Sequence, residues 1–330
     1  MSDFVPFMNN TKKLLWQQYL TQKESYDNLL RVKAKENLFI FNRYILGVDE
    51  GRGKVPLVDF HRDLCNIVTD NTNKKKLILV PRGHLKSTLI TIGYSLFNIV
   101  NNLDCRILIL NATWQMAVDF LTEIKRHLET NETIREYYPE VYEAVMQREE
   151  WSQDRITLKR TDTGIKGPTV WATGINSNLV GSHPDLIIFD DVVNRDTVET
   201  VEQQEKVILR YRDALDLLEP KGQMIVVGTR WTEGDLYGWM LDKDNHIISS
   251  YDVMLKRAYE GNLETGEEFK SLWEQKFNQK ELQTRLREEG WYHFSAQYLN
   301  NPVPVEDADF RRDYFQYFDV DDVKGNNFNK

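Results

Sequence analysis

Short runs of apolar residues alternate with longer amphipathic stretches between residues 77 and 228. Four runs predict strands: 77–80, 106–110, 185–189 and 223–227. Runs that are apolar at nearly every position are typical of strands covered on both faces of a sheet. The stretches between them, 87–101, 114–130 and 198–218, have the length of crossover helices. The pattern therefore predicts an α/β fold with a mainly parallel central sheet and helices on both faces.

The flanking segments differ from this central pattern. Residues 12–46 carry apolar positions at helical spacing and predict two helices, and 58–64 predicts a short third one. Two more polar runs, 156–159 and 169–172, predict additional strands ahead of the third core strand. Beyond residue 300, two prolines and an acidic, aromatic tail predict a linker. We therefore expect an N-terminal helical segment (1–56), one α/β domain (57–300) and a linker (301–330).

The composition narrows the classes of function. With 41% hydrophobic and 28% charged residues the chain is expected to fold, and its net charge of −9 excludes a wholly basic nucleic-acid binder. Its two distant cysteines and six scattered histidines match neither a disulfide framework nor a zinc site. No apolar stretch reaches the ~20 residues that cross a bilayer, and the amino terminus lacks a signal-peptide pattern. We expect a cytoplasmic protein with no membrane partner.

A loop with phosphate-binding character follows the first predicted strand. Residues 81–88 read Pro-Arg-Gly-His-Leu-Lys-Ser-Thr and lead into an apolar helix. In a strand–loop–helix unit of this kind, backbone N–H groups and the helix N-terminus bind phosphate oxygens. Lys86 would then reach the β- and γ-phosphates, and Ser87 would bind Mg²⁺. Val80 and Leu85 occupy the two glycine positions of the usual motif, so an ordinary strand–helix turn remains an alternative.

Paired acids end the third core strand. Asp190 and Asp191 follow the buried run 186–189 and would lie at the carboxyl edge of the sheet, where α/β proteins bind ligands. Asp190 is placed to hold Mg²⁺, and Asp191 to orient or deprotonate an attacking water. Acids that merely cap the next helix are the alternative reading. The lysine-serine loop and the acid pair together favour an ATPase.

These two motifs and a third, the run Val-Val-Gly-Thr-Arg-Trp at 226–231, resemble in order those of the large subunit of tailed-phage terminases, which package double-stranded DNA into procapsids. The resemblance covers roughly residues 55–300. It implies a P-loop NTPase of the additional-strand type that uses ATP and Mg²⁺. It also implies double-stranded DNA, the portal protein, the terminase small subunit and further copies in a ring as partners. The location would be the host cytoplasm, with transient docking on the procapsid.

The resemblance also implies residue roles. Residues Pro81, Arg82, Gly83, His84, Leu85, Lys86, Ser87 and Thr88 would form a deviant Walker A loop, with the characteristic arginine at Arg82. Asp190 would hold the metal, Asp191 would replace the catalytic glutamate of many members, and Thr229 would sense the γ-phosphate as the coupling residue. His183 stands where many members have arginine, which leaves the trans-acting arginine finger unassigned.

Several assignments stay open at this level. His61 and Arg62 lie where the family has an adenine-contacting segment, but no residue is assigned to adenine. DNA contacts could come from Lys74–Lys76 or, more plausibly, from a basic face formed by Arg155, Lys159, Arg160 and Lys166. Arg230 and Trp231 could touch nucleotide or DNA, although packing is favoured for Trp231.

Two other functions compete with the motor. One is a helicase or another nucleic-acid-dependent P-loop ATPase, which is weakened because no second block of alternating strands and helices is visible. The other is a non-catalytic DNA or portal adaptor, which would have no use for a complete set of Lys86, Ser87, Asp190 and Asp191. Family members also carry a C-terminal nuclease domain, which these 330 residues are too short to include, so endonuclease activity is expected only of a longer protein.

Overall fold

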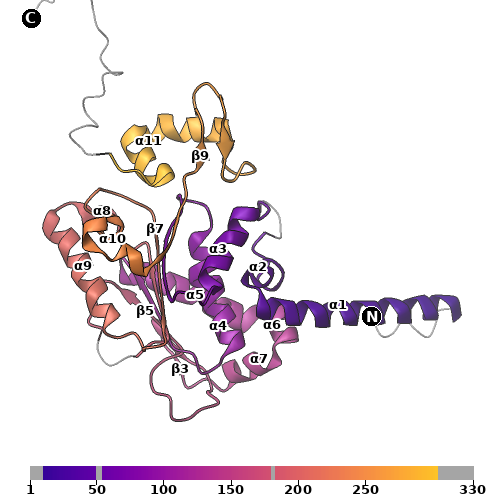
Figure 1. The fold of residues 1–330 in the computed structure, drawn as a ribbon. Helices are drawn as coiled ribbons and strands as arrows, with labels where there is room; N and C mark the ends of the chain where they lie inside the picture. Colours follow the sequence, from indigo (N-terminus) through magenta and orange to yellow (C-terminus); the bar gives the residue numbers. More distant parts are fainter. Residues whose placement is uncertain (1–9, 50–53, 180–182, 304–330) are drawn as a thin grey trace, which may run out of the picture.

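The computed structural model describes residues 10–49, 54–179 and 183–303 and is built around one large sheet (Figure 1). The strands of this sheet are β1 (Lys75–Leu79), β2 (Ile107–Asn111), β3 (Glu150–Trp151), β4 (Arg155–Thr157), β5 (Val170–Gly174), β6 (Leu186–Asp190), β7 (Gln223–Gly228) and β8 (Asp252–Leu255). They lie in the order β3-β4-β5-β2-β6-β7-β1-β8. Neighbours from β5 to β8 pair in parallel, whereas β3 and β4 add antiparallel pairs at one edge. The predicted α/β class with a mainly parallel sheet is confirmed.

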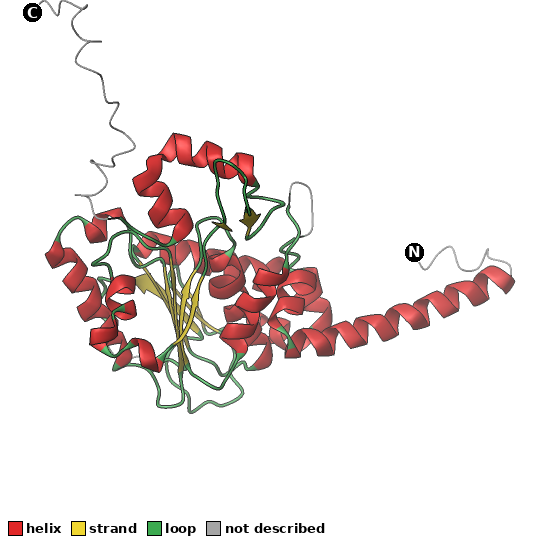
Figure 2. Ribbon diagram, turned by 45° about the horizontal axis from the view of Figure 1, so that its top comes forward, coloured by secondary structure: helices red, strands yellow, loops and turns green. Residues whose placement is uncertain are grey.

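Helices cover both faces of the sheet (Figure 2). The α-helices are α1 (Asn10–Glu36), α2 (Leu38–Ile40), α3 (Asp59–Thr69), α4 (Ser95–Asn101), α5 (Trp114–Thr130), α6 (Glu132–Tyr137), α7 (Pro139–Met146), α8 (Arg195–Val198), α9 (Val201–Leu215), α10 (Leu236–Leu241) and α11 (Gln279–Leu299). Two π-helical segments, η2 (Phe41–Ile45) and η3 (Ser87–Tyr94), two 3₁₀ turns, η4 (Lys243–Asn245) and η5 (Ile248–Ser250), and a hairpin of β9 (Tyr259–Glu260) and β10 (Lys270–Ser271) complete the fold.

The alternation of side chains along each strand divides the core into two layers. In β1, Ile78 faces the layer that includes side chains of α3, α4, α5 and α7, whereas Leu77 and Leu79 face the layer formed with α9 and α10. The other inner strands alternate in the same way. Because both faces are covered, nearly every position of these strands is buried, which explains the continuous apolar runs in the sequence.

The ends of the described chain extend this central unit. α1 projects away from the body (Figure 1), and its last turns and the residues that follow them pack into the same core as α3 and the strands. Within the described residues, no helix is long and apolar enough to cross a membrane. Near the other end of the described chain, α11 and the β9–β10 hairpin lie beyond the carboxyl ends of the strands (Figure 1). The boundaries after residues 56 and 300 stay predictions, and 304–330 lie outside the described residues.

The elements predicted from the sequence are largely confirmed. All four core strands, both additional strands, the three crossover helices and the short helix beginning near residue 58 form close to the expected positions. The predicted crossover at 87–101 consists of η3 followed by α4, so its first two turns are π-helical.

Candidate active site

Two residues of the loop after β1 (residues 81–88, the predicted phosphate loop) have left-handed backbone conformations. Gly83 has φ 78° and Leu85 has φ 62°, so both occupy the left-handed region. For an L-residue such as leucine this conformation costs roughly 1–2 kcal/mol, whereas glycine adopts it freely. Leu85 stands at the second glycine position of the usual motif. The loop therefore follows the path that glycine normally permits, with leucine held in it by the surrounding structure.

The loop lysine meets an acid from the end of another strand. Lys86 Nζ lies 2.8 Å from Asp191 Oδ2, and the Lys86 side chain is only 7% exposed, against 31% for Asp191. Asp191 has φ 45°, and its backbone N–H donates to the carbonyl oxygen of Val227 in β7, the strand between β6 and β1. Residues that lie 105 positions apart in the sequence thus form one ion pair at the carboxyl edge of the sheet.

Asp190 is the fully buried member of the acid pair. Its Oδ2 accepts a 2.6 Å hydrogen bond from the Thr91 hydroxyl in η3, and its backbone oxygen accepts one from the Asn111 side-chain amide at the end of β2. Burial, and secondly the neighbouring Asp191 carboxylate, raise the pKa of Asp190 to about 7, although Lys86 and the hydroxyls of Thr91 and Ser87 oppose the shift. The site therefore holds an acid whose negative charge is poorly compensated.

The surroundings of Asp190 fit a magnesium ion. Asp190 Oδ1 is buried and has no hydrogen-bond partner within the described part of the chain. The Ser87 hydroxyl is close enough to influence the Asp190 carboxyl. A carboxylate oxygen and a hydroxyl are hard oxygen ligands, and Mg²⁺ in nucleotide sites completes its shell with water and phosphate oxygens. No cluster of three or more acidic, histidine or cysteine ligands occurs in the described ranges, so a site of this kind needs the nucleotide as well.

Thr229 connects the end of β7 to the phosphate loop. Its buried hydroxyl donates to the carbonyl oxygen of Val80 at 3.3 Å, and Val80 N–H donates to the carbonyl oxygen of Gly228 at the same distance. The predicted coupling residue is therefore hydrogen-bonded to Val80, the residue directly before the loop. A displacement of one segment would be transmitted to the other through these two bonds.

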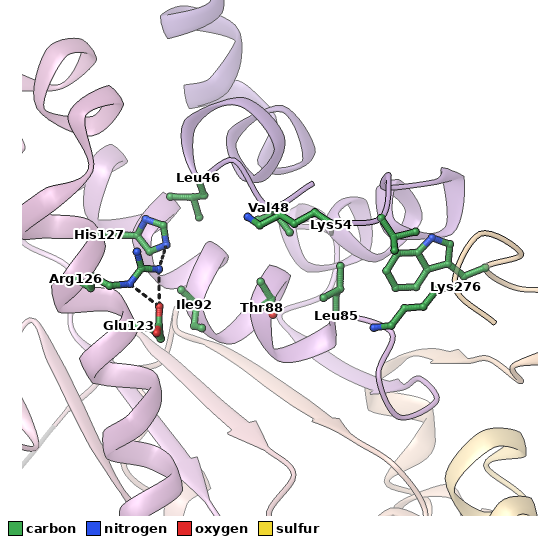
Figure 3. Close-up of a pocket in the computed structure, with 12 residues that line it drawn as sticks. Leu46, Val48, Lys54, Leu85, Thr88, Ile92, Glu123, Arg126, His127 and Lys276 are labelled. Carbon is green, nitrogen blue, oxygen red and sulfur yellow. Dashed lines mark hydrogen bonds and ion pairs between the residues drawn. The ribbon is translucent and has the colours of Figure 1, made fainter. Parts of the chain in front are cut away.

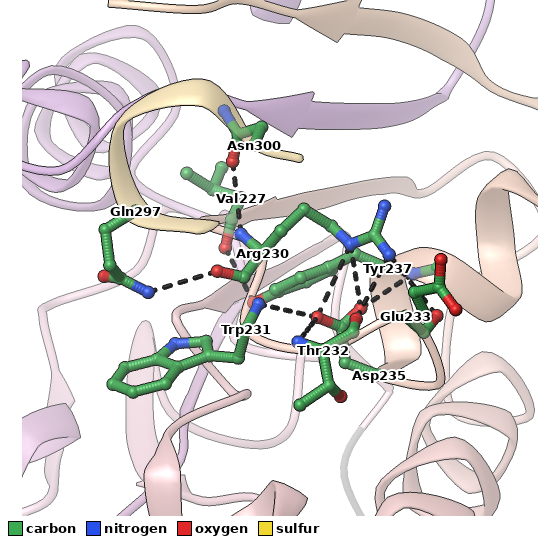
Figure 4. A network of polar contacts seen from close by, with 10 residues as sticks. Val227, Arg230, Trp231, Thr232, Glu233, Asp235, Tyr237, Gln297 and Asn300 are labelled. Atoms are coloured by element: carbon green, nitrogen blue, oxygen red, sulfur yellow. Dashed lines mark hydrogen bonds and ion pairs between the residues drawn. The ribbon is translucent and has the colours of Figure 1, made fainter. Parts of the chain in front are cut away.

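The residues after Thr229 are fixed by a buried polar network (Figure 4). The Arg230 guanidinium is paired with Asp235, and both side chains are nearly or fully buried. Asp235 also accepts N–H bonds from Trp231, Thr232 and Gly238. Arg230 therefore binds an internal carboxylate and is not directed at a ligand.

Trp231 packs with its ring edge-to-face against His293, in agreement with the packing role favoured for it.

The end of α11 joins this network to the phosphate loop. Gln297 Nε2 donates to the carbonyl oxygen of Arg230, and the backbone N–H of Arg82 donates to the carbonyl oxygen of Gln297. Asn300 accepts from the backbone N–H of Arg230 (Figure 4), and it donates to the carbonyl oxygen of Lys256. The C-terminal helix thus holds the start of the phosphate loop and the end of β7 together.

A cavity of about 560 Å³ opens beside the loop and the start of η3 (Figure 3). Leu85, Thr88 and Ile92 form its floor, and Lys276 lies next to Leu85. Further lining residues come from the N-terminal segment, α5 and the stretch before α11: Leu46, Val48, Lys54, Val55, Glu123, Arg126, His127 and Trp273. Apolar surfaces and cations dominate the lining, and its one carboxylate, Glu123, is paired with Arg126. Such a cavity suits an anionic ligand with a flat apolar part.

Two histidines, His84 in the loop and His61 in α3, are buried. His84 Nδ1 is 3.0 Å from the carbonyl oxygen of Arg82, and its ring stacks on Phe277. His61 Nδ1 accepts the backbone N–H of Val58, and its ring lies edge-on to Trp273. Burial lowers the pKa of His61 to about 3 and that of His84 to about 4, so both are neutral near pH 7. In this structure His61 supports the loop from within the core and does not line the cavity.

Some candidate residues are not brought into the site. Arg82 has an exposed side chain, and only its backbone is tied to α11. His183 is exposed just before β6 begins, at the opposite edge of the sheet from Lys86. Neither position supplies an in-chain contact to the Lys86–Asp191 pair.

The structure corrects part of the expected basic surface. Arg160 was expected on a DNA-facing strand, but it is buried and donates to the carbonyl oxygens of Asp104 and Gly167. The guanidinium of Arg155 lies over the ring of Trp171. Lys76 is completely buried and paired with Asp252. These cations stabilise loops and strands, so a basic patch that includes Arg160 or Lys76 is wrong.

The structure also adds residues that the sequence reasoning missed. Thr91 and Asn111 contact Asp190. Both positions could have been found from the sequence. Thr91 lies one helical turn after Ser87, and Asn111 ends a buried strand as Asp190 does. Gln297, Asn300 and Lys276 carried no such signal, since their contacts are made with residues far away in the sequence, such as the bond from Lys276 to Gly83 across 193 positions.

Comparisons with known proteins find a similar sequence and a similar fold. No family model matches the sequence. The terminase large subunit of Enterobacteria phage T3 is 25% identical over 259 residues, which are 73% of this chain but 43% of that protein, so the chain spans less than half of this curated relative. The large terminase of bacteriophage HK97 has a similar fold, with a TM-score of 0.54 and 15% identity over 81% of this chain and 55% of that one.

The ATPase domain of the Thermus phage P74-26 large terminase matches with a TM-score of 0.44 and 15% identity, over 76% of this chain and 95% of that one. The resemblance first seen in the motifs is confirmed by the relation to the phage T3 protein and by the fold shared with the HK97 protein. By sequence the chain is similar to the terminase large subunit of phage T3, and by fold it is similar to the large terminase of bacteriophage HK97.

Proposed function

We propose that the chain binds and hydrolyses ATP, and that it uses this hydrolysis to move double-stranded DNA into a procapsid as the motor part of a terminase large subunit. The observation that carries the proposal is the Lys86–Asp191 ion pair, formed between a phosphate-binding loop and the acid pair at the end of β6. A loop lysine and a strand-end acid within contact distance are the two protein groups that ATP hydrolysis needs first.

Phosphate binding is assigned to the loop and its lysine. The backbone of residues 81–88 and the start of η3 present N–H groups to phosphate oxygens. Lys86 places its ammonium on the β- and γ-phosphates, and the exposed side chain of Arg82 adds a second positive charge near the γ-phosphate. For Lys86 to do so, its ammonium must exchange Asp191 for phosphate.

Metal binding is assigned to Ser87 and Asp190. The unpartnered Asp190 Oδ1 and the nearby Ser87 hydroxyl are the protein ligands that a magnesium ion would use. When bound, Mg²⁺ neutralises charge on the phosphate oxygens. Binding of the cation would also lower the pKa of Asp190 and remove the cost of its uncompensated negative charge.

The chemical step is assigned to Asp191. Once Lys86 has moved to phosphate, the half-exposed Asp191 carboxylate is free to accept a proton from the attacking water. Thr229 senses the γ-phosphate through its bond to Val80 and transmits the change along β7. The nucleoside is assigned to the cavity beside Leu85 and Thr88, whose cationic and apolar lining matches a nucleotide.

The partners follow from the same proposal. Double-stranded DNA is the substrate that is moved, and the portal protein, the terminase small subunit and further copies of the chain in a ring are the assembly partners. The protein would act in the host cytoplasm and dock transiently on the procapsid. Residues 57–300 would form the ATPase domain, with a helical segment before it and a linker after it.

The proposal is tested by ATP hydrolysis with and without double-stranded DNA. The wild-type chain should release phosphate. Lys86→Ala should reduce the rate of ATP hydrolysis at least about 100-fold, because no ammonium then stabilises the negative charge on the phosphates. Lys221→Ala, an exposed lysine before β7 at the far edge of the sheet, is the matched control and should keep the wild-type rate. Equal hydrolysis by the wild type and Lys86→Ala would overturn the proposal.

A further inference from the structure

A segment from the C-terminal part of the chain lies against the phosphate loop. Lys276, between β10 and α11, places its Nζ 2.7 Å from the carbonyl oxygen of Gly83, to which it donates a hydrogen bond. The next residue, Phe277, stacks on His84 with ring centroids 4.5 Å apart. A Cβ atom on Gly83 would lie 2.9 Å from the Phe277 ring, so the loop and this segment are in close contact. The contact joins residues that are 193 positions apart.

The ammonium of Lys276 has no anionic partner among the described residues. Its only hydrogen bond there is to the neutral Gly83 carbonyl oxygen, and its Nζ lies over the rings of Trp273 and Phe277 at 5.0 and 5.3 Å. Desolvation by these neighbours lowers the pKa of Lys276. The two other lysines buried close to the strand ends, Lys86 and Lys76, are each paired with a carboxylate. Lys276 is therefore the partly desolvated cation at the loop whose charge is left unbalanced.

This cation lies beside the loop that is proposed to bind phosphate. Lys276 lines the same cavity as Leu85 and Thr88, the residues on either side of the Lys86–Ser87 pair (Figure 3). A lysine side chain is flexible, and its three N–H donors can serve the Gly83 carbonyl oxygen and a phosphate oxygen together. A nucleotide seated at the loop would bring its negative charge within reach of this ammonium.

We propose that Lys276 contacts the nucleotide directly, and that its ammonium binds the phosphate chain from the side of the cavity while remaining close to Gly83. This rests on the proposed function and assigns one further residue to the nucleotide site. Two lysines then supply the positive charge that binds nucleoside di- and triphosphates. One is Lys86 in the loop, and the other is Lys276 in the segment before α11, far along the sequence. Because Phe277 stacks on His84, binding at Lys276 also holds this segment against the loop.

Binding of ATP and ADP to three variants tests the proposal. Lys276→Met keeps the aliphatic stem over the two rings and removes the charge, and it should weaken binding about 10-fold, as expected for one charge-assisted contact. Lys276→Arg keeps the charge and should stay within about threefold of the wild type. Lys280→Met, at an exposed lysine in the first turn of α11, is the matched control and should change nothing.

Salt separates a direct contact from a structural role. If the ammonium acts on phosphate charge, the loss in Lys276→Met should be large at about 0.1 M salt and much smaller at about 1 M, because salt screens the interaction. An affinity within twofold of the wild type, or the same loss at both salt concentrations, would overturn the inference. Binding that depends on Lys86 but not on Lys276 would overturn this inference alone, whereas a wild-type chain that binds no ATP would overturn the proposed function with it.

Discussion

The ammonium nitrogen of Lys86 lies 2.8 Å from a carboxylate oxygen of Asp191, so the proposed phosphate-binding residue and the proposed base neutralise each other in the described structure. This relationship has a cost for a ligand, because a nucleotide must take Lys86 from a partner that is already in contact. It also has a use, since an Asp191 carboxylate held by Lys86 cannot act as a base until the phosphates have drawn the lysine away.

Asp191→Asn should therefore bind ATP more tightly than the wild type. The substitution removes the negative charge that competes for Lys86 and leaves the Thr91 and Asn111 contacts of Asp190 in place. We expect a gain of about 3- to 10-fold in affinity, measured by titration with a fluorescent ATP analogue. Asp196→Asn, at an exposed acid in α8, is the control and should not alter binding. A weaker affinity for Asp191→Asn would show that the ion pair assists binding instead.

Leu85 offers a test of the loop conformation. Its φ of 62° favours glycine, so Leu85→Gly should be more stable than Leu85→Ala by about 1 kcal/mol, although glycine has the smaller side chain. The free energy of unfolding of both variants, measured by urea denaturation, checks this order. As a control, Leu89→Gly in η3 should be less stable than Leu89→Ala. If Leu85→Ala is the more stable member of its pair, the left-handed conformation at this position is wrong.

The buried histidines predict a loss of stability in mild acid. The pKa of His84 is lowered to about 4 from an ordinary value of 6.5, so between these two pH values the unfolded chain binds a proton that the folded chain does not. Stability from this group is therefore full above pH 6.5 and falls as the pH drops toward 4, by about 1.4 kcal/mol per pH unit.

This prediction is checked by comparing His84→Phe with the wild type. The free energy of unfolding of the variant should depend less steeply on pH in that window, whatever its absolute value at pH 7. His183→Gln, at an exposed histidine, should keep the wild-type slope. Identical slopes for the wild type and His84→Phe would show that His84 is protonated to the same extent in the folded and unfolded states.

Thr229 should couple hydrolysis to DNA movement through its hydroxyl. Thr229→Val keeps the shape and loses the bond to the Val80 carbonyl oxygen, so we expect ATP binding close to that of the wild type together with a loss of DNA translocation. Thr229→Ser retains the hydroxyl and should retain translocation. The measurement is ATP-dependent packaging with purified procapsids, and normal packaging by Thr229→Val would remove the coupling role.

The sequence was sufficient to predict the strands and the two motifs at their ends. Continuous apolar runs identify strands buried on both faces, and their order along the chain places Lys86 and Asp191 at the same edge of a parallel sheet. Apolar runs and the motifs that follow them can be recognised without knowing the rest of the fold, which explains why the fold class could be predicted from the sequence alone.

Contacts made by the C-terminal part of the chain could not be predicted in this way. Lys276 and Gln297 reach the loop, and Asn300 reaches the end of β7, because the segment around α11 lies against the carboxyl edge of the sheet, and no periodicity in the sequence indicates this arrangement. The error at Arg160 has a related cause. A basic residue on a polar strand is usually exposed, but here two backbone carbonyl groups satisfy its guanidinium inside the fold.

The central claim, that Lys86 and Asp191 form an ATP-hydrolysing site, is tested most directly by a single turnover of ATP bound to the purified chain with Mg²⁺ and double-stranded DNA. The account predicts that the wild type and Asp196→Asn convert the bound ATP to ADP, whereas Asp191→Asn keeps it uncleaved for at least about 100 times longer because the proton acceptor is gone. Cleavage by Asp191→Asn at the wild-type rate would contradict the account.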